Sequence, residues 1–228
     1  MSWMQRLYQT YERAMALPDI ANSAKPMPIS HTVQNAHLEI TLDGEGTFKR
    51  VQVLEKHPIV LPATEKSAGR SSGEAAHALA DKIQYVAADY PQHGGTKAAY
   101  FDSYQQQLGE WANSDFSHPS VRAVYAYINK QRVVADLLHH QIMVCDAEGV
   151  LLRYWQVEKE KMPLLFKALP KELGKLEQGS ALVCWRVEAD DVTCPQTWLD
   201  TDLQQQWVEF NSKQADTADF CYVSGQHE

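Results

Sequence analysis

The residues with the clearest potential for chemistry lie in one short stretch, residues 65–73, which reads Glu-Lys-Ser-Ala-Gly-Arg-Ser-Ser-Gly. Its two glycines, Gly69 and Gly73, permit backbone angles that other residues avoid, and they let a partner approach the main chain closely. Its two cations, Lys66 and Arg70, carry the charge that is needed to hold phosphate groups. The composition therefore predicts an exposed loop that could contact nucleic acid.

Two adjacent serines, Ser71 and Ser72, add hydroxyl groups that can donate or accept hydrogen bonds at the edge of a base. A helix is expected to begin just after the loop, and the free N–H groups at a helix start favour an anion. The alternative interpretation is an ordinary capped loop, because the stretch lacks the consensus of a phosphate-binding loop. Judged from these residues alone, both interpretations stay open.

Other residue types suited to catalysis or metal binding occur without the spacing that such sites need. His139 and His140 are neighbours on an expected helix, where adjacent side chains point about 100° apart and do not chelate one ion together. His-Glu-x-x-His and Gly-x-Ser-x-Gly patterns are missing, and Cys145 precedes Asp146 without a catalytic signature. A metal-dependent nuclease would also need clustered Asp, Glu and His. We therefore expect a protein that is not an enzyme and that uses no metal or cofactor.

The distribution of charge limits how this chain could bind nucleic acid. The formal net charge is -8 at pH 7. Residues 1–100 hold ten Lys and Arg against ten Asp and Glu, whereas residues 101–228 hold eleven against nineteen. Because duplex binding is driven by cations that displace counterions from phosphates, we expect the chain alone to bind DNA poorly. The acidic second half should instead face protein partners.

The cysteines and the hydropathy predict a cytoplasmic protein. The four cysteines form no Cys-x-x-Cys pair, and three of them lie in apolar, strand-like segments. They are expected to be reduced thiols of the core rather than a disulfide or a zinc site. No run of about 18 apolar residues occurs, which predicts no membrane span. Tryptophan and tyrosine could stack on bases, but their helical and strand periods favour places in the core.

Hydrophobic periodicity predicts an α+β fold, in which early and late antiparallel strands form a sheet and inserted helices form a small helical lobe. Two alternating runs around an Asp-Gly turn, 37–42 and 48–54, predict a hairpin. A second hairpin is expected from 142–146 and 150–155. Helices are expected at 3–17, 75–90, 96–113, 118–140, 161–176 and 199–210, strands also at 58–62, 181–187 and 220–223, and loops at 19–34 and 63–73.

This order of elements divides the chain into three parts. Residues 1–95 form the hairpin, the sheet and the loop region. Residues 96–141 form the helical insertion, and residues 142–228 supply a hairpin, a strand and a helix that complete the α+β domain. The candidate loop at 65–73 should then lie between the early sheet and the helix that follows it.

Six segments, in order along nearly the whole chain, carry a resemblance to a known family. They are WMQRLYQTYERAM, LEITLDGEG, GRSSGEAAHALADKIQYV, SHPSVRAVYAYI, ALVCWRVEADDV with WLDTDLQQQWVEF, and FCYVSGQ. They resemble the opening helix, first hairpin, basic-Ser-Ser-Gly loop, His-Pro helix, strand with its Trp helix, and Cys-x-Val segment of the Csd-type large subunit of type I-C CRISPR Cascade. Family members are longer, so the chain is expected to be the N-terminal portion.

The resemblance implies a role in crRNA-guided defence against foreign DNA. The family's N-terminal region reads the PAM in duplex DNA and helps to open the strands, while guide pairing supplies the remaining specificity. The implied partners are target double-stranded DNA, the other Cascade subunits with their crRNA, and the helicase-nuclease that degrades the target. A phage-encoded inhibitor is a further candidate partner, and no membrane is expected to take part.

Carried onto this chain, the resemblance makes residues 69–73 the PAM-sensing loop. Ser72 would read base edges in a minor groove about 6 Å wide, while Arg70 and Lys66 would hold the flanking phosphates. The alternative is a protein-interaction scaffold that docks other Cascade subunits without touching DNA, in which the loop is only structural.

Overall fold

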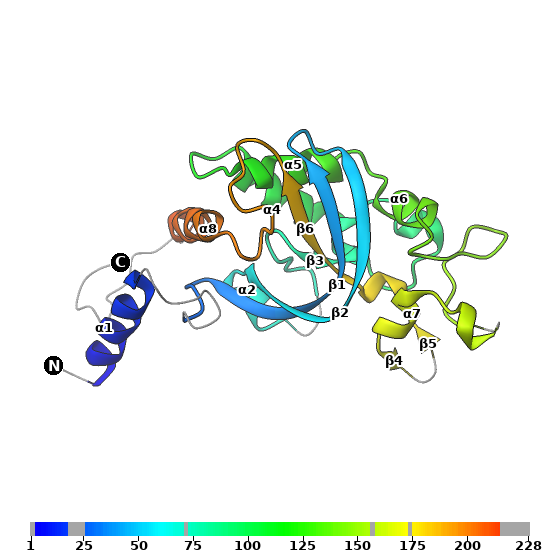
Figure 1. Cartoon of the computed structure of the whole chain (residues 1–228), viewed down its shortest axis with the longest axis horizontal. Helices are drawn as coiled ribbons and strands as arrows, with labels where there is room; N and C mark the ends of the chain where they lie inside the picture. Colours follow the sequence, from blue (N-terminus) through cyan, green and yellow to red (C-terminus); the bar gives the residue numbers. More distant parts are fainter. Residues whose placement is uncertain (1–2, 18–25, 71–72, 156–157, 173–174, 215–228) are drawn as a thin grey trace.

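The computed structural model describes residues 3–17, 26–70, 73–155, 158–172 and 175–214. Its centre is a curved four-stranded sheet with the strand order β2-β1-β6-β3 (Figure 1). The strands are β1 (His31–Asp43), β2 (Phe48–Pro62), β3 (Asp81–Lys82) and β6 (Leu182–Glu188), and β4 (Lys171–Glu172) pairs with β5 (Lys175–Leu176) in a separate small sheet. Strands and helices are mixed along the chain, which confirms the α+β class.

Eight α-helices and several short 3-10 helices are found among the described residues. They are α1 (Trp3–Ala16), α2 (Glu65–Ala68), α3 (Ile83–Val86), α4 (Phe101–Ala112), α5 (Pro119–Ile128), α6 (Val133–His139), α7 (Leu164–Ala168) and α8 (Thr201–Lys213), with 3-10 helices η2 (Pro91–His93), η3 (Lys159–Lys161) and η4 (Gln178–Ser180). Within the described part of the chain, no helix has both the length and the apolar character that crossing a membrane requires.

The hairpin of β1 and β2 closes as the Asp-Gly pattern predicts. The Asp43 carboxylate accepts a hydrogen bond from the N–H of Thr47 at 2.7 Å, which holds the turn. Gly46 has a φ of +67°, and a Cβ there would lie 2.4 Å from the carbonyl oxygen of Ala123 in α5. The turn therefore needs a glycine and packs directly against the helical layer.

The same hairpin is longer than its alternating core predicts. The register shifts between Ala36 and Leu38, and Lys56 in β2 has a φ of +43°. Such an irregularity bends a hairpin, and beyond it the two strands continue to pair. The loop expected at 19–34 is therefore wrong for its last residues, which belong to β1, and the separate strand expected at 58–62 is the end of β2.

The early and late strands of the sheet meet in a parallel pair, in which Ile40 of β1 lies beside Trp185 of β6. Antiparallel pairing was expected here. The pair is parallel because the chain crosses over through helices before it returns to the sheet, as parallel neighbours require. Leu38, Ile40 and Leu42 point to the helix-covered face and are fully buried, so the predicted alternation holds.

Helices α4 and α5 cover that face of the sheet. The His118 ring caps α5 by accepting the N–H of Ser120 at 3.2 Å, and Pro119 occupies the first turn, as predicted. In α4, Trp111 is fully buried, and its ring centre lies 5.0 Å from that of Trp207 in α8. The residues expected to form a helical lobe thus share one hydrophobic core with the sheet and with α8.

Helix α8 begins where an aspartate caps it and packs by its aromatic side. The Asp200 carboxylate accepts the N–H groups of Asp202 and Leu203, both at 3.1 Å. The Trp207 indole donates to the carbonyl of Ser30 at 2.8 Å, which ties α8 to the residue just before β1. The late amphipathic helix predicted from the sequence is confirmed.

Helix α1 is also confirmed, but it lies apart from the core (Figure 1). None of its residues is buried, and Trp3 and Leu7 are 73% and 58% exposed. The Tyr11 hydroxyl donates to the carbonyl of Met27 at 3.2 Å, which ties the C-terminal half of the helix to the segment before β1. Its apolar stripe therefore remains on the surface of this chain.

The helix expected at 75–90 is wrong for most of its length. The chain instead runs as irregular backbone through the core, and only the four residues of α3 are helical. The carbonyl of Leu79 accepts hydrogen bonds from the Tyr104 hydroxyl at 2.6 Å and from the Trp185 indole at 2.8 Å. Side chains from other elements satisfy this buried carbonyl, so it needs no helical partner.

The predicted helices of the middle region are shorter than expected. Thr96 does not cap a helix, because its hydroxyl donates to Glu177, and α4 begins at Phe101. The long helix expected at 118–140 divides into α5 and α6, with Gln131 at a φ of +53° between them.

Two predictions for residues 142–176 are largely wrong. The second hairpin is reduced to a single bridge between Cys145 and Leu151. In the helix expected at 161–176 only the five residues of α7 are α-helical, because Pro163 precedes them and Pro170 follows soon after. The strand expected at 220–223 lies outside the described residues.

Candidate nucleic-acid interface

The candidate stretch begins with a one-turn helix rather than an open loop. The Thr64 side chain accepts the N–H of Ser67 at 3.2 Å, and the Ser67 hydroxyl accepts the N–H of Thr64 at 2.9 Å, which makes a reciprocal cap for α2. Lys66 is exposed on this turn, and Gly69 ends it with no described atom within 4 Å of the place a Cβ would take. The backbone at Gly69 is therefore open to a partner.

Arg70 does not face solvent as expected. Its guanidinium makes a two-pronged ion pair with Asp81, with N–O distances of 2.7 and 2.9 Å, and it donates to the carbonyl of Ala75 at 2.6 Å. The side chains of Arg70 and Asp81 are only 6% and 0% exposed. The guanidinium carbon also lies 4.1 Å from the ring centre of Tyr85. The expectation that Arg70 holds a phosphate is therefore wrong, because all of its directed contacts are internal.

The buried carboxylate of Asp81 organises the backbone around this ion pair. It accepts the N–H of His77 and the N–H of Lys82, both at 2.8 Å. Burial lowers the pKa of His77 to about 4, so its ring is neutral at pH 7. That neutral ring lies 3.2 Å, from Nδ1 to Oγ, from Ser67 of α2. One network thus links α2, Arg70 and the start of β3.

The far side of the stretch is also bound to the core, through one hydrogen bond at Gly73. Gly73 has a φ of +107°, and its carbonyl accepts a hydrogen bond from the Tyr85 hydroxyl at 2.5 Å. Around a Cβ placed at Gly73, no described atom lies within 4 Å. Ser71 and Ser72 lie outside the described residues. Arg70 and Gly73, which flank them, are therefore both anchored on the same short helix, α3, and the carboxylate beside it.

The charge around the candidate stretch is balanced. Residues 65–82 hold three Lys or Arg and three Asp or Glu, and the Arg70 charge is cancelled by Asp81. Glu65 and Glu74 are exposed on either side of Lys66 and the turn. A duplex that approached this surface would therefore gain little from counterion release at the turn itself.

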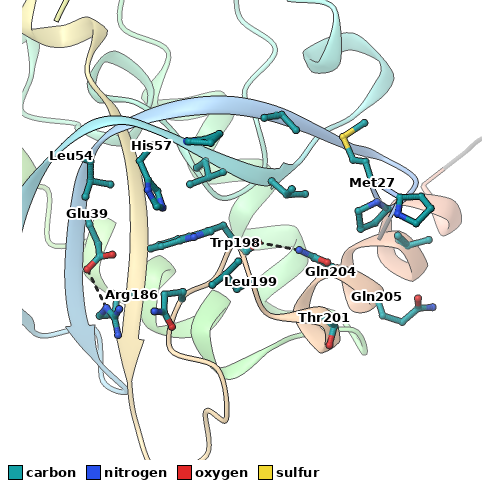
Figure 2. A pocket seen from close by; sticks show the side chains of 18 of the residues that line it. Met27, Glu39, Leu54, His57, Arg186, Trp198, Leu199, Thr201, Gln204 and Gln205 are labelled. Atoms are coloured by element: carbon teal, nitrogen blue, oxygen red, sulfur yellow. Dashed lines mark hydrogen bonds and ion pairs between the residues drawn. The ribbon is translucent and has the colours of Figure 1, made fainter. Parts of the chain in front are cut away.

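A second feature, which the sequence did not reveal, is a groove of about 770 Å³ on the face of the sheet away from α4 and α5. The far ends of β1 and β2, the start of α8 and the segment around Met27 line it (Figure 2). Trp198 lies at its centre, with His57 edge-on to it at 5.7 Å between ring centres. Leu54 and Leu199 extend the apolar wall.

One end of the groove is polar. Glu39 is buried, and it accepts hydrogen bonds from Gln52 at 3.0 Å and from Arg186 at 3.1 Å. A buried carboxylate that is paired and hydrogen-bonded in this way is a structural feature, and it offers a partner few free acceptors. The sequence did not reveal the groove because its walls come from β1, β2, β6 and the start of α8, which lie far apart in the chain. The apolar run at 58–62 was the one signal for it.

Across the described ranges, no three His, Cys, Asp or Glu side chains gather where they could hold a metal ion. Cys145, Cys184 and Cys194 are free thiols, as expected, and burial raises the pKa of Cys184 well above its usual value. Cys221 lies outside the described residues.

Comparison with known proteins adds a family match over almost the whole chain. A family model described as "CRISPR-associated protein (Cas_Csd1)" matches residues 7–228. The match includes the hairpin, the anchored turn, the helical layer and α8. No curated protein matches the chain.

Proposed function

Because the chain belongs to the Cas_Csd1 family of CRISPR-associated proteins, we propose that it forms part of the large subunit of a type I-C Cascade complex. In this proposal it is a non-catalytic module that contacts the PAM of target duplex DNA and helps to start strand opening. Pairing between the crRNA and the target strand then supplies the rest of the sequence specificity.

The observation that carries the proposal is the anchoring on both sides of Ser71 and Ser72. Arg70 is bound to Asp81 on one side, and the Gly73 carbonyl is bound by Tyr85 on the other. Contacts that read a base must be held in one place, and anchors built on packed elements achieve this at little cost on binding. Arg70 thus changes role, from a phosphate contact to a support for the turn.

Within the turn, each remaining residue has a separate task. Ser72 reads the edge of a base, and the open backbone at Gly69 and Gly73 lets the turn enter a narrow groove. Lys66 contacts a flanking phosphate from the exposed side of α2. Since the surroundings are neutral, other subunits of the complex supply most of the grip on DNA.

Close approach at Gly69 can be tested separately from folding. A Cβ at this position meets no described atom within 4 Å, and the φ of −93° suits any residue, so Gly69→Leu should leave the stability nearly unchanged. In the assembled complex it should weaken binding of a PAM-bearing duplex by roughly tenfold or more, because a large side chain blocks the groove. Ala135→Leu, on an exposed position of α6, is the control. Equal binding by Gly69→Leu and the control would rule out entry of this turn into a groove.

The second candidate function, a scaffold that docks another Cascade subunit without touching DNA, is favoured by the groove around Trp198. In this case the occupant is an apolar segment of a neighbouring Cascade subunit, since the groove walls are apolar and α1 beside it keeps Trp3 and Leu7 exposed. Val33 and Leu199 line the groove and are 53% and 44% exposed, so acidic substitutions there spare the core.

The Val33→Glu/Leu199→Glu variant separates the two functions. If the groove docks a subunit, native mass spectrometry should show loss of this chain from the complex. If the complex assembles normally and only Gly69→Leu impairs target binding, the DNA-contacting function is favoured over the scaffold.

A further inference from the structure

A small pocket of about 380 Å³ lies where Thr96, Lys97 and Arg153 meet the residues beside the small sheet of β4 and β5. Its lining includes Thr96, Lys97, Lys175 and Glu177. Three of the side chains that line it are cations and one is a carboxylate, which is unusual in a chain whose net charge is -8.

The floor of this pocket is rigidly built. Tyr90 is fully buried between Gly95 and Gly179, and a Cβ at either glycine would lie 2.4 Å from the tyrosine side chain. The Tyr90 hydroxyl donates to Glu177 at 2.9 Å, and the Thr96 hydroxyl donates to the same carboxylate. Glu177 is thereby fixed in position, with both of its oxygens already engaged.

The cations at the rim are less engaged. Arg153 Nε lies 3.5 Å from Glu177 Oε2. The Arg153 Nε atom is buried, and it makes no hydrogen bond within the described part of the chain. Among the described residues, neither the Lys97 nor the Lys175 ammonium has an ion-pair partner. An anion that entered the pocket would therefore meet two ammonium groups without an ion-pair partner among the described residues, beside an arginine that already faces Glu177.

The surrounding sequence strengthens the positive field. Six of the eleven Lys and Arg residues in 101–228 fall between Arg153 and Lys175, against three Glu in the same interval. In Figure 1 the described part of this interval forms a small lobe with α7, β4 and β5 that projects from the sheet. The acidic half of the chain thus contains one basic lobe with a concave site at its base, and such clustering focuses the local field for anions.

We propose that this pocket binds the phosphodiester backbone of nucleic acid, with Lys97, Arg153 and Lys175 as the phosphate contacts. Contacts of this kind are independent of base sequence. They would supply a cationic grip that the turn at 69–73 lacks. The inference does not depend on that turn reading a PAM, because scrambling the PAM should leave binding at this pocket unchanged.

The test measures binding of the full chain to a fluorescent 20-bp duplex and to a single-stranded RNA of the same length, by anisotropy from about 50 to 200 mM salt. The Lys97→Gln/Lys175→Gln variant should lose affinity by roughly tenfold or more. Its salt slope should shrink by about 1.8 for duplex DNA, or about 1.4 for RNA, because two phosphate contacts are lost. A loss of affinity for the duplex alone would identify DNA as the bound nucleic acid, and a loss for the single strand alone would identify RNA. Lys56→Gln, an exposed lysine on β2, is the matched control.

A third variant gives a prediction of opposite sign. Glu177→Gln keeps an acceptor oxygen for one of the Tyr90 and Thr96 hydroxyls and presents an N–H donor to the other. It removes the negative charge of the pocket, so affinity should rise several-fold. Thermal unfolding of each variant checks that the fold is intact. The proposal is overturned if the double lysine variant matches Lys56→Gln in both arms, or if Glu177→Gln weakens binding while remaining folded.

Discussion

Arg70 and Asp81 form a two-pronged ion pair at 2.7 and 2.9 Å in which both side chains are almost wholly removed from water. The same chain holds an exposed pair of the same geometry, Arg50 and Glu188, at 2.5 and 3.1 Å. The two pairs differ in burial, with side-chain exposures of 6% and 0% against 58% and 42%, and in the two backbone N–H groups that Asp81 also accepts. They therefore allow the effect of burial to be measured within one fold.

Removing one partner of the buried pair should destabilise the fold strongly. Asp81→Ala leaves a buried guanidinium without its counter-charge and leaves the N–H groups of His77 and Lys82 unpaired. The expected loss in the free energy of unfolding is roughly 3–5 kcal/mol, measured by urea denaturation. Glu188→Ala breaks the exposed pair and should change stability little, because exposed ion pairs contribute little. Similar losses in the two variants would contradict the burial argument.

Stability should fall as the pH is lowered from 6.5 toward 4, partly through His77. The pKa of His77 is lowered to about 4 by burial, so between these values the unfolded chain binds a proton that the folded chain does not. His77 alone contributes at most about 1.4 kcal/mol per pH unit in this window and nothing above it. Urea denaturation at several pH values provides the measurement.

The His77→Gln variant isolates this contribution. His31, His37 and His118 also have lowered pKa values through burial, so the wild-type slope contains several protons. The difference in the free energy of unfolding between wild type and His77→Gln should therefore narrow as the pH falls from 6.5 toward 4. Two parallel stability curves would show that His77 titrates alike in the folded and the unfolded chain.

Glycines that pack against Tyr90 should tolerate no side chain. In Gly179→Ala the new Cβ would lie 2.4 Å from the Tyr90 side chain. Overpacking of this kind costs roughly 1–3 kcal/mol, visible as a lower thermal midpoint. Gly69→Ala, where no described atom lies within 4 Å, should change stability by less than about 0.5 kcal/mol. A neutral Gly179→Ala would mean that Tyr90 can move aside, and the pocket floor would not be rigid.

The parts of the fold that were predicted correctly are those set by local signals. The Asp43 turn, the His118 cap with Pro119, and the amphipathic stripe around Trp207 each depend on residues within a few positions of one another. The stretch at 75–90 has a helical pattern of apolar residues, yet its Leu79 carbonyl bonds to side chains far away in the sequence. Hydrogen-bond partners so distant in sequence cannot be identified from local patterns, because only the folded structure brings them together.

The candidate site divides in the same way. Gly69 and Lys66 are open to a partner, as their residue types indicate. Arg70 was predicted to be exposed because it stands beside serines and glycines. No local pattern indicates that it forms an ion pair with Asp81, eleven positions later. The groove and the basic pocket were not foreseen, since the groove joins segments more than 100 residues apart and the pocket joins segments more than 50 residues apart.

The most direct test of the proposed function compares the affinity of the assembled complex for duplexes with the cognate PAM and with a scrambled PAM. For Ser72→Ala, the ratio of the two affinities should fall roughly threefold to tenfold, since one hydrogen bond to a base edge is lost. Binding of the scrambled duplex should stay the same. An unchanged ratio in a normally assembled Ser72→Ala complex would show that this turn does not read the PAM.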